Sequence, residues 1–264
     1  AFLLVVEVAE EFRESAVHDV RDDDLTRRRG GAEVVDDGHA EEDFVVQHGM
    51  MRLGILVGAL AAAGLVVAVE LSAQQPGTPP DVRVTIDHNA VTSATPAFKF
   101  ARVPPPMKDD AGAKAVLKLV DGEGDTNGAA LTALVDGLLP RDEDEPGANF
   151  FFDAGTAGGR FRMDLGSAID ISEVRTYSWH PNTRGPQVYT LYASDGADPK
   201  FNLSPRNDVN PATSGWTLIA MVDTRTPQGD PGGQYGVSIK KAGGSLGKFR
   251  HLLFVCSATE TDDD

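Results

Sequence analysis

The stretch of residues 162–196 constrains the fold more than any other part of the chain. It reads RMDLGSAIDISEVRTYSWHPNTRGPQVYTLYASDG and contains three short segments, 162–165, 172–179 and 187–194. Gly, Pro, Asn and Asp separate the three segments. The second and third segments are rich in Val, Thr and Tyr. Segments of this length and composition are typical of antiparallel strands. The sequence therefore predicts three strands here and an all-β domain around them.

The connection between the second and third of these strands, residues 180–186, reads HPNTRGP. It is polar, carries an imidazole and a cation, and has aromatic residues on both sides. A rigid β scaffold that presents such a loop favours binding over catalysis.

A secretory signal peptide is predicted at residues 50–73. Arg52 precedes an uninterrupted apolar run, 53–69, and small residues follow at Ala68 and Ala73. This arrangement is typical of a signal peptide, with cleavage expected after Ala73 or, as the second choice, after Ala68. The run is 17 residues long, at the lower limit for spanning a bilayer. A retained N-terminal membrane anchor is therefore the alternative.

Residues 1–49 precede this predicted signal. Residues 1–50 contain 14 acidic and 5 basic side chains and no sustained apolar periodicity. Such a composition is typical of a disordered acidic tail. Because an export signal does not work behind fifty residues, we interpret 1–49 as a non-native or disordered extension and expect no fold there.

Residues 74–264 carry 25 acidic and 18 basic side chains. This net charge of −7 is ordinary for a soluble exported domain and argues against nucleic acid as a partner. The single cysteine, Cys256, lies in the apolar run HLLFVCSA, where a small buried residue is expected and a reactive thiol is the alternative. The sequence lacks GxSxG, HExxH, phosphate-loop and dinucleotide-binding motifs, so we expect no enzyme.

The remaining chain divides into residues 74–95, a linker with a candidate first strand at 81–86, and a β domain at 96–264. Residues 113–120 are ambiguous between strand and short helix. The other segments expected to form strands are 96–104, 149–155, 216–224, 237–241 and 248–258.

Several ordered motifs resemble the discoidin, or coagulation factor 5/8 type C, family. They are Asp164-Leu165-Gly166, Ser194-Asp195-Gly196, and a Trp that opens the next strand, here Trp216. The segments NFFF, TYSWHP, GGQYGVSI and LGKFRHLLF are similar to a group of secreted bacterial discoidin-like proteins of unknown role. The resemblance covers about residues 96–260. It implies an antiparallel jelly-roll β-sandwich of the galactose-binding-like type.

Three features depart from that family. The insertion between Gly196 and Trp216 is longer than usual, and no cysteine pair joins the domain ends. The sequence also stops at SATETDDD, where the family continues into a final strand. We therefore expect the C-terminal strand to be missing, which would leave a sheet edge uncovered.

The resemblance also implies a structural calcium ion near the turn at Asp136-Gly137. Calcium binds six to eight oxygen atoms, from carboxylates and carbonyls. The expected ligands are Asp136, Asp142 and Asp144, and no other cofactor is expected. The alternative is that residues 142–145 form a solvated acidic loop. The series 121–127 has alternating acidic residues, but we interpret it as a turn.

A ligand is expected at the 180–186 loop, at the end of the sandwich where family members bind. Arg184 offers a planar fork of donors for sugar hydroxyls or carboxylates, and an aromatic ring could stack on a pyranose. The expected binding residues are Trp179, His180, Asn182, Arg184 and Tyr235. Because strands alternate, Tyr177 and Trp179 share one face, opposite Thr176 and Ser178. The alternative is that the aromatic rings pack in the sheet and Arg184 pairs with a local carboxylate. For Tyr235, a tyrosine packed in a hairpin is the alternative.

Together these features predict a non-catalytic module that is secreted, periplasmic or on the cell surface. The expected partner is a glycan or cell-surface polysaccharide. The alternatives are a structural or adhesive domain that binds a protein partner and an accessory domain of a hydrolase. Contact with a membrane is expected only if the signal segment is retained.

Overall fold

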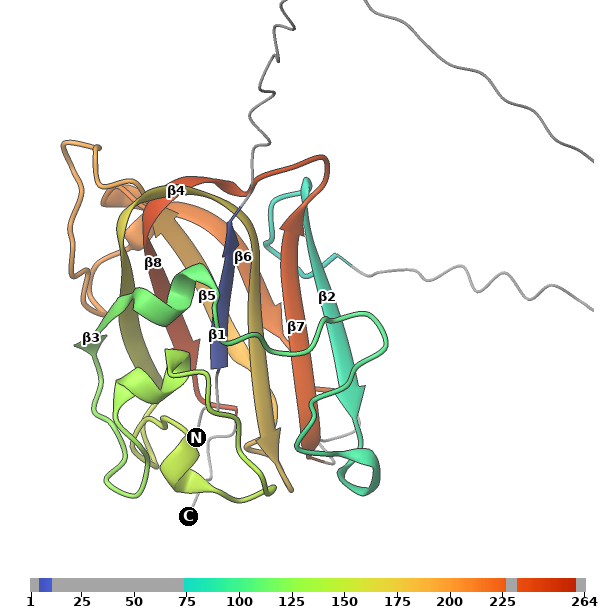
Figure 1. Cartoon of the computed structure of the whole chain (residues 1–264). Helices are drawn as coiled ribbons and strands as arrows, with labels where there is room; N and C mark the ends of the chain where they lie inside the picture. The colour runs from blue at the N-terminus through green and yellow to red at the C-terminus, as the bar shows by residue number, and fades with distance from the viewer. Residues whose placement is uncertain (1–4, 11–73, 227–231, 260–264) are drawn as a thin grey trace, which may run out of the picture. The chain divides into compact units, whose positions relative to one another are not determined.

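The computed structural model describes residues 5–10, 74–226 and 232–259, and this part of the chain forms an antiparallel β-sandwich (Figure 1). The predicted all-β class is therefore confirmed. The strands are β1 (Val5–Glu10), β2 (Val82–Asn89), β3 (Val116–Asp121), β4 (Gly158–His180), β5 (Val188–Ser194), β6 (Thr217–Asp223), β7 (Gly233–Lys241) and β8 (Gly247–Ser257). Five single 3-10 turns occur between them: η1 (Val91–Ser93), η2 (Ala111–Lys114), η3 (Leu131–Val135), η4 (Pro146–Ala148) and η5 (Pro211–Thr213).

The strands follow the order β2-β7-β4-β8-β5-β6, and β1 and β3 also pair with β4. The two strands at the ends of this order, β2 and β6, come into contact, so the sheet is nearly closed on itself. Near-closure leaves few unpaired strand edges, which lowers the risk of edge-to-edge aggregation.

The long strand β4 connects the two layers. Residues 158–164 pair with β8, and residues 160–164 also pair with β3. Further along, residues 171–177 pair with β1 and residues 173–180 with β7. Between these halves the register shifts, and Gly166 has a φ of +82°, a conformation that favours glycine. The expectation of separate strands at 162–165 and 172–179 was wrong, because the Gly166 region bends the strand without ending it.

Alternation along β4 separates two apolar clusters. Val174 faces the main core between the layers, together with residues of β2, β5, β6, β7 and β8. Tyr177 and Trp179 lie on the other face, where Phe98, Val103 and Phe151 cover them. The predicted division of these positions between two faces is therefore confirmed.

Two predicted strands are absent from the described residues. Segment 96–104 runs as irregular chain and supplies Phe98 and Phe100 to the outer aromatic cluster. Segment 149–155 makes only one isolated bridge, between Phe152 and Gly124. In both segments the aromatic rings pack against the sheet while the backbone stays outside the ladder. The ambiguous segment 113–120 contains the end of η2 followed by β3.

The strands expected at 81–86, 216–224, 237–241 and 248–258 are confirmed as β2, β6, β7 and β8 with small shifts of their ends. Cys256 is buried in the core, which raises the pKa of its thiol, so the expected packing role holds.

The expectation of no fold in residues 1–49 was wrong for residues 5–10. These residues form β1 and pair with β4 at 171–177. The predicted signal peptide at 50–73 lies outside the described residues. Among the residues that the structure describes, no helix has the length and apolar character needed to cross a membrane.

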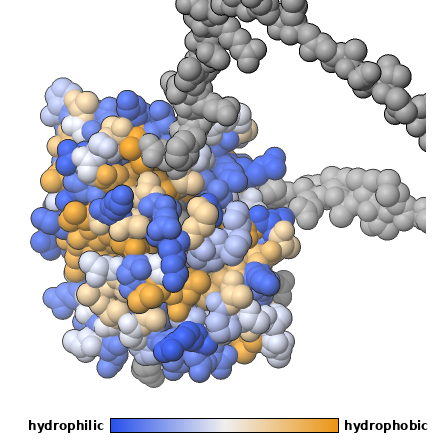
Figure 2. Space-filling model, viewed as in Figure 1, coloured by the Kyte–Doolittle hydropathy of each residue, from blue (hydrophilic) through white to orange (hydrophobic). Residues whose placement is uncertain are grey.

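The face of the domain seen in Figure 2 mixes hydrophilic and hydrophobic residues. Large exposed apolar side chains include Val116 and Leu119 of β3, together with Leu138. Single exposed apolar residues are common on protein surfaces and do not by themselves indicate a site.

Candidate functional site

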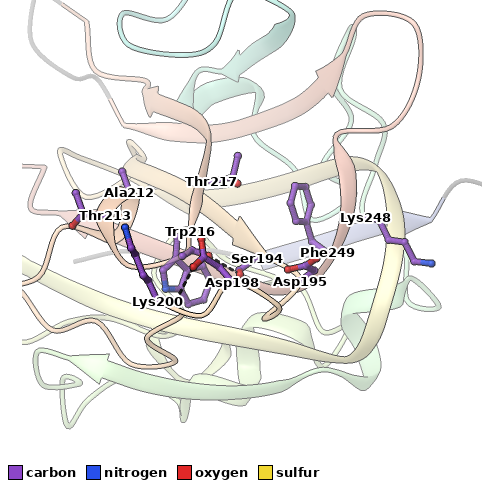
Figure 3. A pocket seen from close by; sticks show the side chains of 11 residues that line it. Ser194, Asp195, Asp198, Lys200, Ala212, Thr213, Trp216, Thr217, Lys248 and Phe249 are labelled. Atoms are coloured by element: carbon purple, nitrogen blue, oxygen red, sulfur yellow. Dashed lines mark hydrogen bonds between the residues drawn. The ribbon is translucent and has the colours of Figure 1, made fainter.

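A polar groove of about 570 Å³ opens where β5 ends and where β6 and β8 begin (Figure 3). The insertion 197–215 forms one of its walls. This volume falls within the range of about 300–1,000 Å³ that small-molecule sites occupy. The lining residues are Ser194, Asp195, Asp198, Lys200, Ala212, Thr213, Gly215, Trp216, Thr217, Lys248 and Phe249.

Side chains of opposite character face this groove. Phe249 is half-buried and presents an apolar ring on one side, while Lys200 is exposed on the other (Figure 3). Thr213 and Thr217 are exposed and add two hydroxyl groups. That of Thr213 donates to the Asn210 carbonyl at 3.0 Å and can still accept a hydrogen bond. The groove thus combines an apolar surface with several hydrogen-bonding groups.

The insertion that forms the wall is held in place by a buried arginine of β4. Nη1 of Arg160 donates hydrogen bonds to the backbone carbonyls of Pro205, Arg206 and Val209, at 2.9, 2.8 and 2.9 Å. A carboxylate adds a second anchor, since Asp121 accepts a hydrogen bond from the backbone N–H of Asn207 at 2.6 Å. The insertion is therefore fixed to the sandwich along its length.

Short local turns shape the rim of the groove. The Asp195 carboxylate accepts a hydrogen bond from the N–H of Ala197, and the Asp198 carboxylate accepts one from Lys200. Asp side chains commonly form such turns with the backbone two residues further on. The Ser194 hydroxyl donates to the Gly215 carbonyl at 2.7 Å, which joins the two ends of the insertion.

An aromatic layer lies under the insertion. The Phe201 ring lies 5.2 Å from that of Trp216 and stacks on that of His251 at 5.3 Å. Trp216 is buried, and its Nε1 donates a hydrogen bond to the Asn202 carbonyl at 2.8 Å. Gly215 has a φ of +81° and passes close to the backbone of Phe201, so a side chain there would collide. Trp216 is therefore a structural residue of this layer, and it also lines the groove.

A charged cluster stands next to this aromatic layer. Arg250 donates two hydrogen bonds to Asp164, at 2.8 and 3.1 Å, and these bonds lower the pKa of Asp164 to about 2. Arg162 lies 3.6 Å from the same carboxylate. Burial lowers the pKa of His251, so its imidazole is neutral near pH 7.

The loop predicted to bind a ligand lies at the opposite end of β5. His180 and Arg184 line a hollow of only about 90 Å³ together with Asp125, Asn127 and Asp144. Burial is the main cause that lowers the pKa of His180, and the Arg184 cation lowers it further. The structure therefore brings His180 and Arg184 together, but beside two carboxylates. The alternative, in which Arg184 pairs with a local carboxylate, stays a prediction.

Hydrogen bonds fix the shape of this loop. The Asn182 side chain accepts a hydrogen bond from the N–H of Arg184 at 3.3 Å, and His180 Nδ1 accepts one from the N–H of Asn182 at 3.3 Å. The buried Ser178 hydroxyl donates to the Gly185 carbonyl at 2.5 Å. Asn182 thus forms a turn, although its exposed position leaves it accessible.

The two aromatic residues predicted to contact the ligand are inaccessible. Trp179 is 6% exposed and packs edge-on against Phe98, at 5.7 Å between ring centroids. Tyr235 is 1% exposed and stacks on His88 at 4.4 Å. Their expected contact with ligand was wrong. Phe98, Val103 and Phe151 cover Trp179. Tyr235 lies beside Ser178 on the other face of the sheet, where its ring is close to Gly185.

The structure does not gather the carboxylates of the three predicted calcium ligands into one group. Asp136 accepts a hydrogen bond from the N–H of Leu138, Asp142 accepts one from Glu143, and Asp144 lines the small hollow near Arg184. Within the described ranges, no group of three or more His, Cys, Asp or Glu side chains is placed to hold a metal ion. Residues 121–127 form a turn, as expected.

Comparisons with protein-family models, with curated proteins and with solved structures found no match to this chain. The fold and the groove therefore define an antiparallel β-sandwich with a polar cavity at one end, and they identify no family.

Sequence reasoning missed the groove residues, above all Lys200, Thr217 and Phe249. The unusual length of the insertion between Gly196 and Trp216 was the available signal. Inserted segments that are anchored to a rigid scaffold often carry a binding function.

Proposed function

We propose that this chain is a non-catalytic binding module that recognises carbohydrate through the groove between the insertion 197–215 and the start of β8. The observation that supports this proposal best is the combination of the half-buried Phe249 ring with exposed Lys200, Thr213 and Thr217 around one cavity of about 570 Å³.

Sugars match this combination chemically. A pyranose has an apolar C–H face that packs on an aromatic ring, and hydroxyl groups around its edge that donate and accept hydrogen bonds. Thr217 can do both, Lys200 donates, and Asp195 accepts. Thr213 can accept, because its hydroxyl proton is donated to the Asn210 carbonyl. Small-molecule sites usually combine an apolar surface with a small number of precisely placed polar groups.

Rigidity of the groove wall supports binding further. Arg160 and Asp121 hold the insertion in one position before any ligand arrives. Pre-ordering of a loop reduces the conformational entropy that binding would otherwise cost.

A binding role also fits the acidic residues of the groove. The Asp195 and Asp198 side chains each accept a hydrogen bond from a backbone N–H, and this use as turn formers explains their presence. Export to the cell surface or periplasm, where glycans are abundant, is part of the same proposal and is supported by the predicted signal segment.

A glycan array tests the proposal directly. We expect the full chain to bind a subset of glycans, and Phe249→Ala or Lys200→Ala to weaken that binding about tenfold, equivalent to about 1.4 kcal/mol. Leu203→Ala is the matched control, because this exposed residue of the insertion does not line the groove.

Folding of each variant must be checked by thermal unfolding, because Phe249 also packs on the core. Lys200 is fully on the surface, so its variant reports on binding alone. Failure of the full chain to bind any glycan, or binding by Lys200→Ala and Phe249→Ala as tight as that of the wild type, would argue against carbohydrate recognition in this groove.

A further inference from the structure

The elements that contact β1 in the sandwich are all distant from it in the sequence. All six residues of β1 pair antiparallel with β4, from Val5 opposite Tyr177 to Glu10 opposite Ile171. On its other side, β1 contacts η2 and η3 (Figure 1). The body of the fold thus forms a slot, bounded by β4 and by η2, into which one strand fits.

Val8 occupies the centre of this slot. Its side chain is fully buried in the main core, next to Val174 on β4. Its backbone N–H donates a hydrogen bond to Asp110 Oδ1 at 3.1 Å, and the same oxygen accepts the N–H of Gly112 at 2.5 Å. Asp110 therefore satisfies a donor on the edge of β1 that faces away from β4.

Most of the other contacts that hold β1 are hydrogen bonds to its backbone. The Ser172 hydroxyl donates to the Ala9 carbonyl at 3.0 Å, in addition to the ladder between β1 and β4. A slot that binds a strand through its backbone and one small apolar side chain accepts an added strand in the manner of β-augmentation.

The connection to the rest of the chain makes exchange feasible. Residues 11–73 separate β1 from the next described segment. The effective concentration of a strand tethered to its own slot falls as the connecting chain lengthens. An identical strand from another copy then competes for the slot. Such exchange is a low-cost route to dimers, because every contact already exists within one chain.

We propose that β1 is an exchangeable strand and that the slot between β4 and η2 accepts residues Val5–Glu10 of a second copy of this chain. The slot and the groove share no residue, so this inference is independent of carbohydrate binding by the groove. It concerns the full chain, because cleavage after Ala73 at the predicted signal segment would remove β1.

A disulfide between positions 8 and 174 can trap the exchanged state. Because the Val8 N–H points to Asp110 and not to β4, the Val8–Val174 pair is of the non-hydrogen-bonded kind. In such pairs the Cα atoms lie about 4.5 Å apart, which is within the range for disulfides. Cysteine also packs like a small apolar residue, so both substitutions are mild.

The test uses two full-length variants, Val8→Cys and Val174→Cys. They are unfolded, refolded together at increasing concentration and oxidised, and covalent dimers are measured on non-reducing gels. We expect a heterodimer whose fraction rises with concentration. It should exceed by at least tenfold the fraction obtained when Val8→Cys is mixed with Val116→Cys, whose cysteine lies on β3 away from β1.

The Val8→Cys/Val174→Cys double variant shows whether the pairing itself exists. If it closes a disulfide within one chain while the mixed single variants stay monomeric at every concentration, β1 does not exchange. If the double variant fails to close, Val8 does not lie opposite Val174, and the slot itself is refuted. The wild-type chain, whose one cysteine is the buried Cys256, should form no covalent dimer.

Discussion

At the scale of single residues, Asp164 shows how a sequence motif acquires a physical role. It belongs to the Asp-Leu-Gly motif where β4 bends, and it accepts two hydrogen bonds from Arg250 on β8. Arg162 and His251 lie close to the same carboxylate. Asp164 therefore ties the bend of β4 to β8, directly beside the aromatic layer under the groove.

Stability should fall in acid partly through this residue. The pKa of Asp164 is lowered from 3.8 to about 2, so its carboxylate stabilises the fold fully above about pH 4 and loses this effect as the pH falls toward 2. Allowing for solvent screening, we expect a contribution on the order of 1 kcal/mol. Urea unfolding at several pH values should show a shallower decline between pH 4 and 2 for Asp164→Asn than for the wild type.

Asp142→Asn is the control for this pH dependence, since the Asp142 carboxylate is exposed in the acidic loop. It should follow the wild-type curve. A decline of equal steepness in wild type and Asp164→Asn would contradict the role given to Asp164.

Single residues were only partly predictable. Alternation placed Tyr177 and Trp179 on one face, which is correct, but it could not show that this face is covered. The cover comes from Phe98 and Phe151, which are distant in sequence and lie outside any strand. Burial by irregular segments leaves no periodic pattern, so Trp179 was mistaken for an accessible residue. Tyr235 lies on the other face, and the sequence does not show that its ring stacks on His88.

At the scale of elements, the insertion 197–215 depends on one buried side chain. The Arg160 guanidinium donates to three of its backbone carbonyls. Removal of Arg160 leaves these carbonyls without that donor, and a lost hydrogen bond from a charged group costs about 1.5–3 kcal/mol. The groove wall should loosen as a result.

We therefore expect Arg160→Met to lower the free energy of unfolding by about 2–4 kcal/mol and to speed amide hydrogen exchange in residues 197–215. Arg206→Met is the matched control. The Arg206 side chain is 72% exposed and forms a surface ion pair with Asp121, so its loss should cost less than about 1 kcal/mol. Equal effects of the two substitutions would show that Arg160 does not anchor the insertion.

Elements with a strong local signal were predicted well. β2, β6, β7 and β8 follow runs of β-branched and aromatic residues, and the structure confirms them. The continuity of β4 through Gly166 was missed because glycine indicates a turn and a bend equally well. The Phe-rich segment 149–155 was predicted as a strand for its composition, but its rings pack while its backbone pairs at one bridge only.

At the scale of the whole molecule, β5 connects two loop regions of different character. At its start, the 181–186 loop closes over a hollow of about 90 Å³, and at its end the insertion opens a groove of about 570 Å³. The sequence directed attention to the first because it carries a cation and a histidine. Cavity size depends on how distant segments pack, which the sequence does not display.

The role of β1 was also beyond sequence reasoning. The acidic composition of residues 1–50 predicted a chain without structure, and the apolar residues at its start were too few to outweigh that pattern. Only the structure shows that Val8 fits opposite Val174 and completes the core.

Localisation of a bound glycan on the full chain tests the proposed function most directly. The ¹⁵N-labelled protein would be titrated with the tightest-binding glycan from the array, and amide chemical shifts would be followed by NMR. We predict that the shift changes concentrate at residues 194–200, 212–217 and 248–249, which surround the groove. Changes concentrated at residues 180–187, or no changes at saturating glycan, would contradict carbohydrate recognition by the groove.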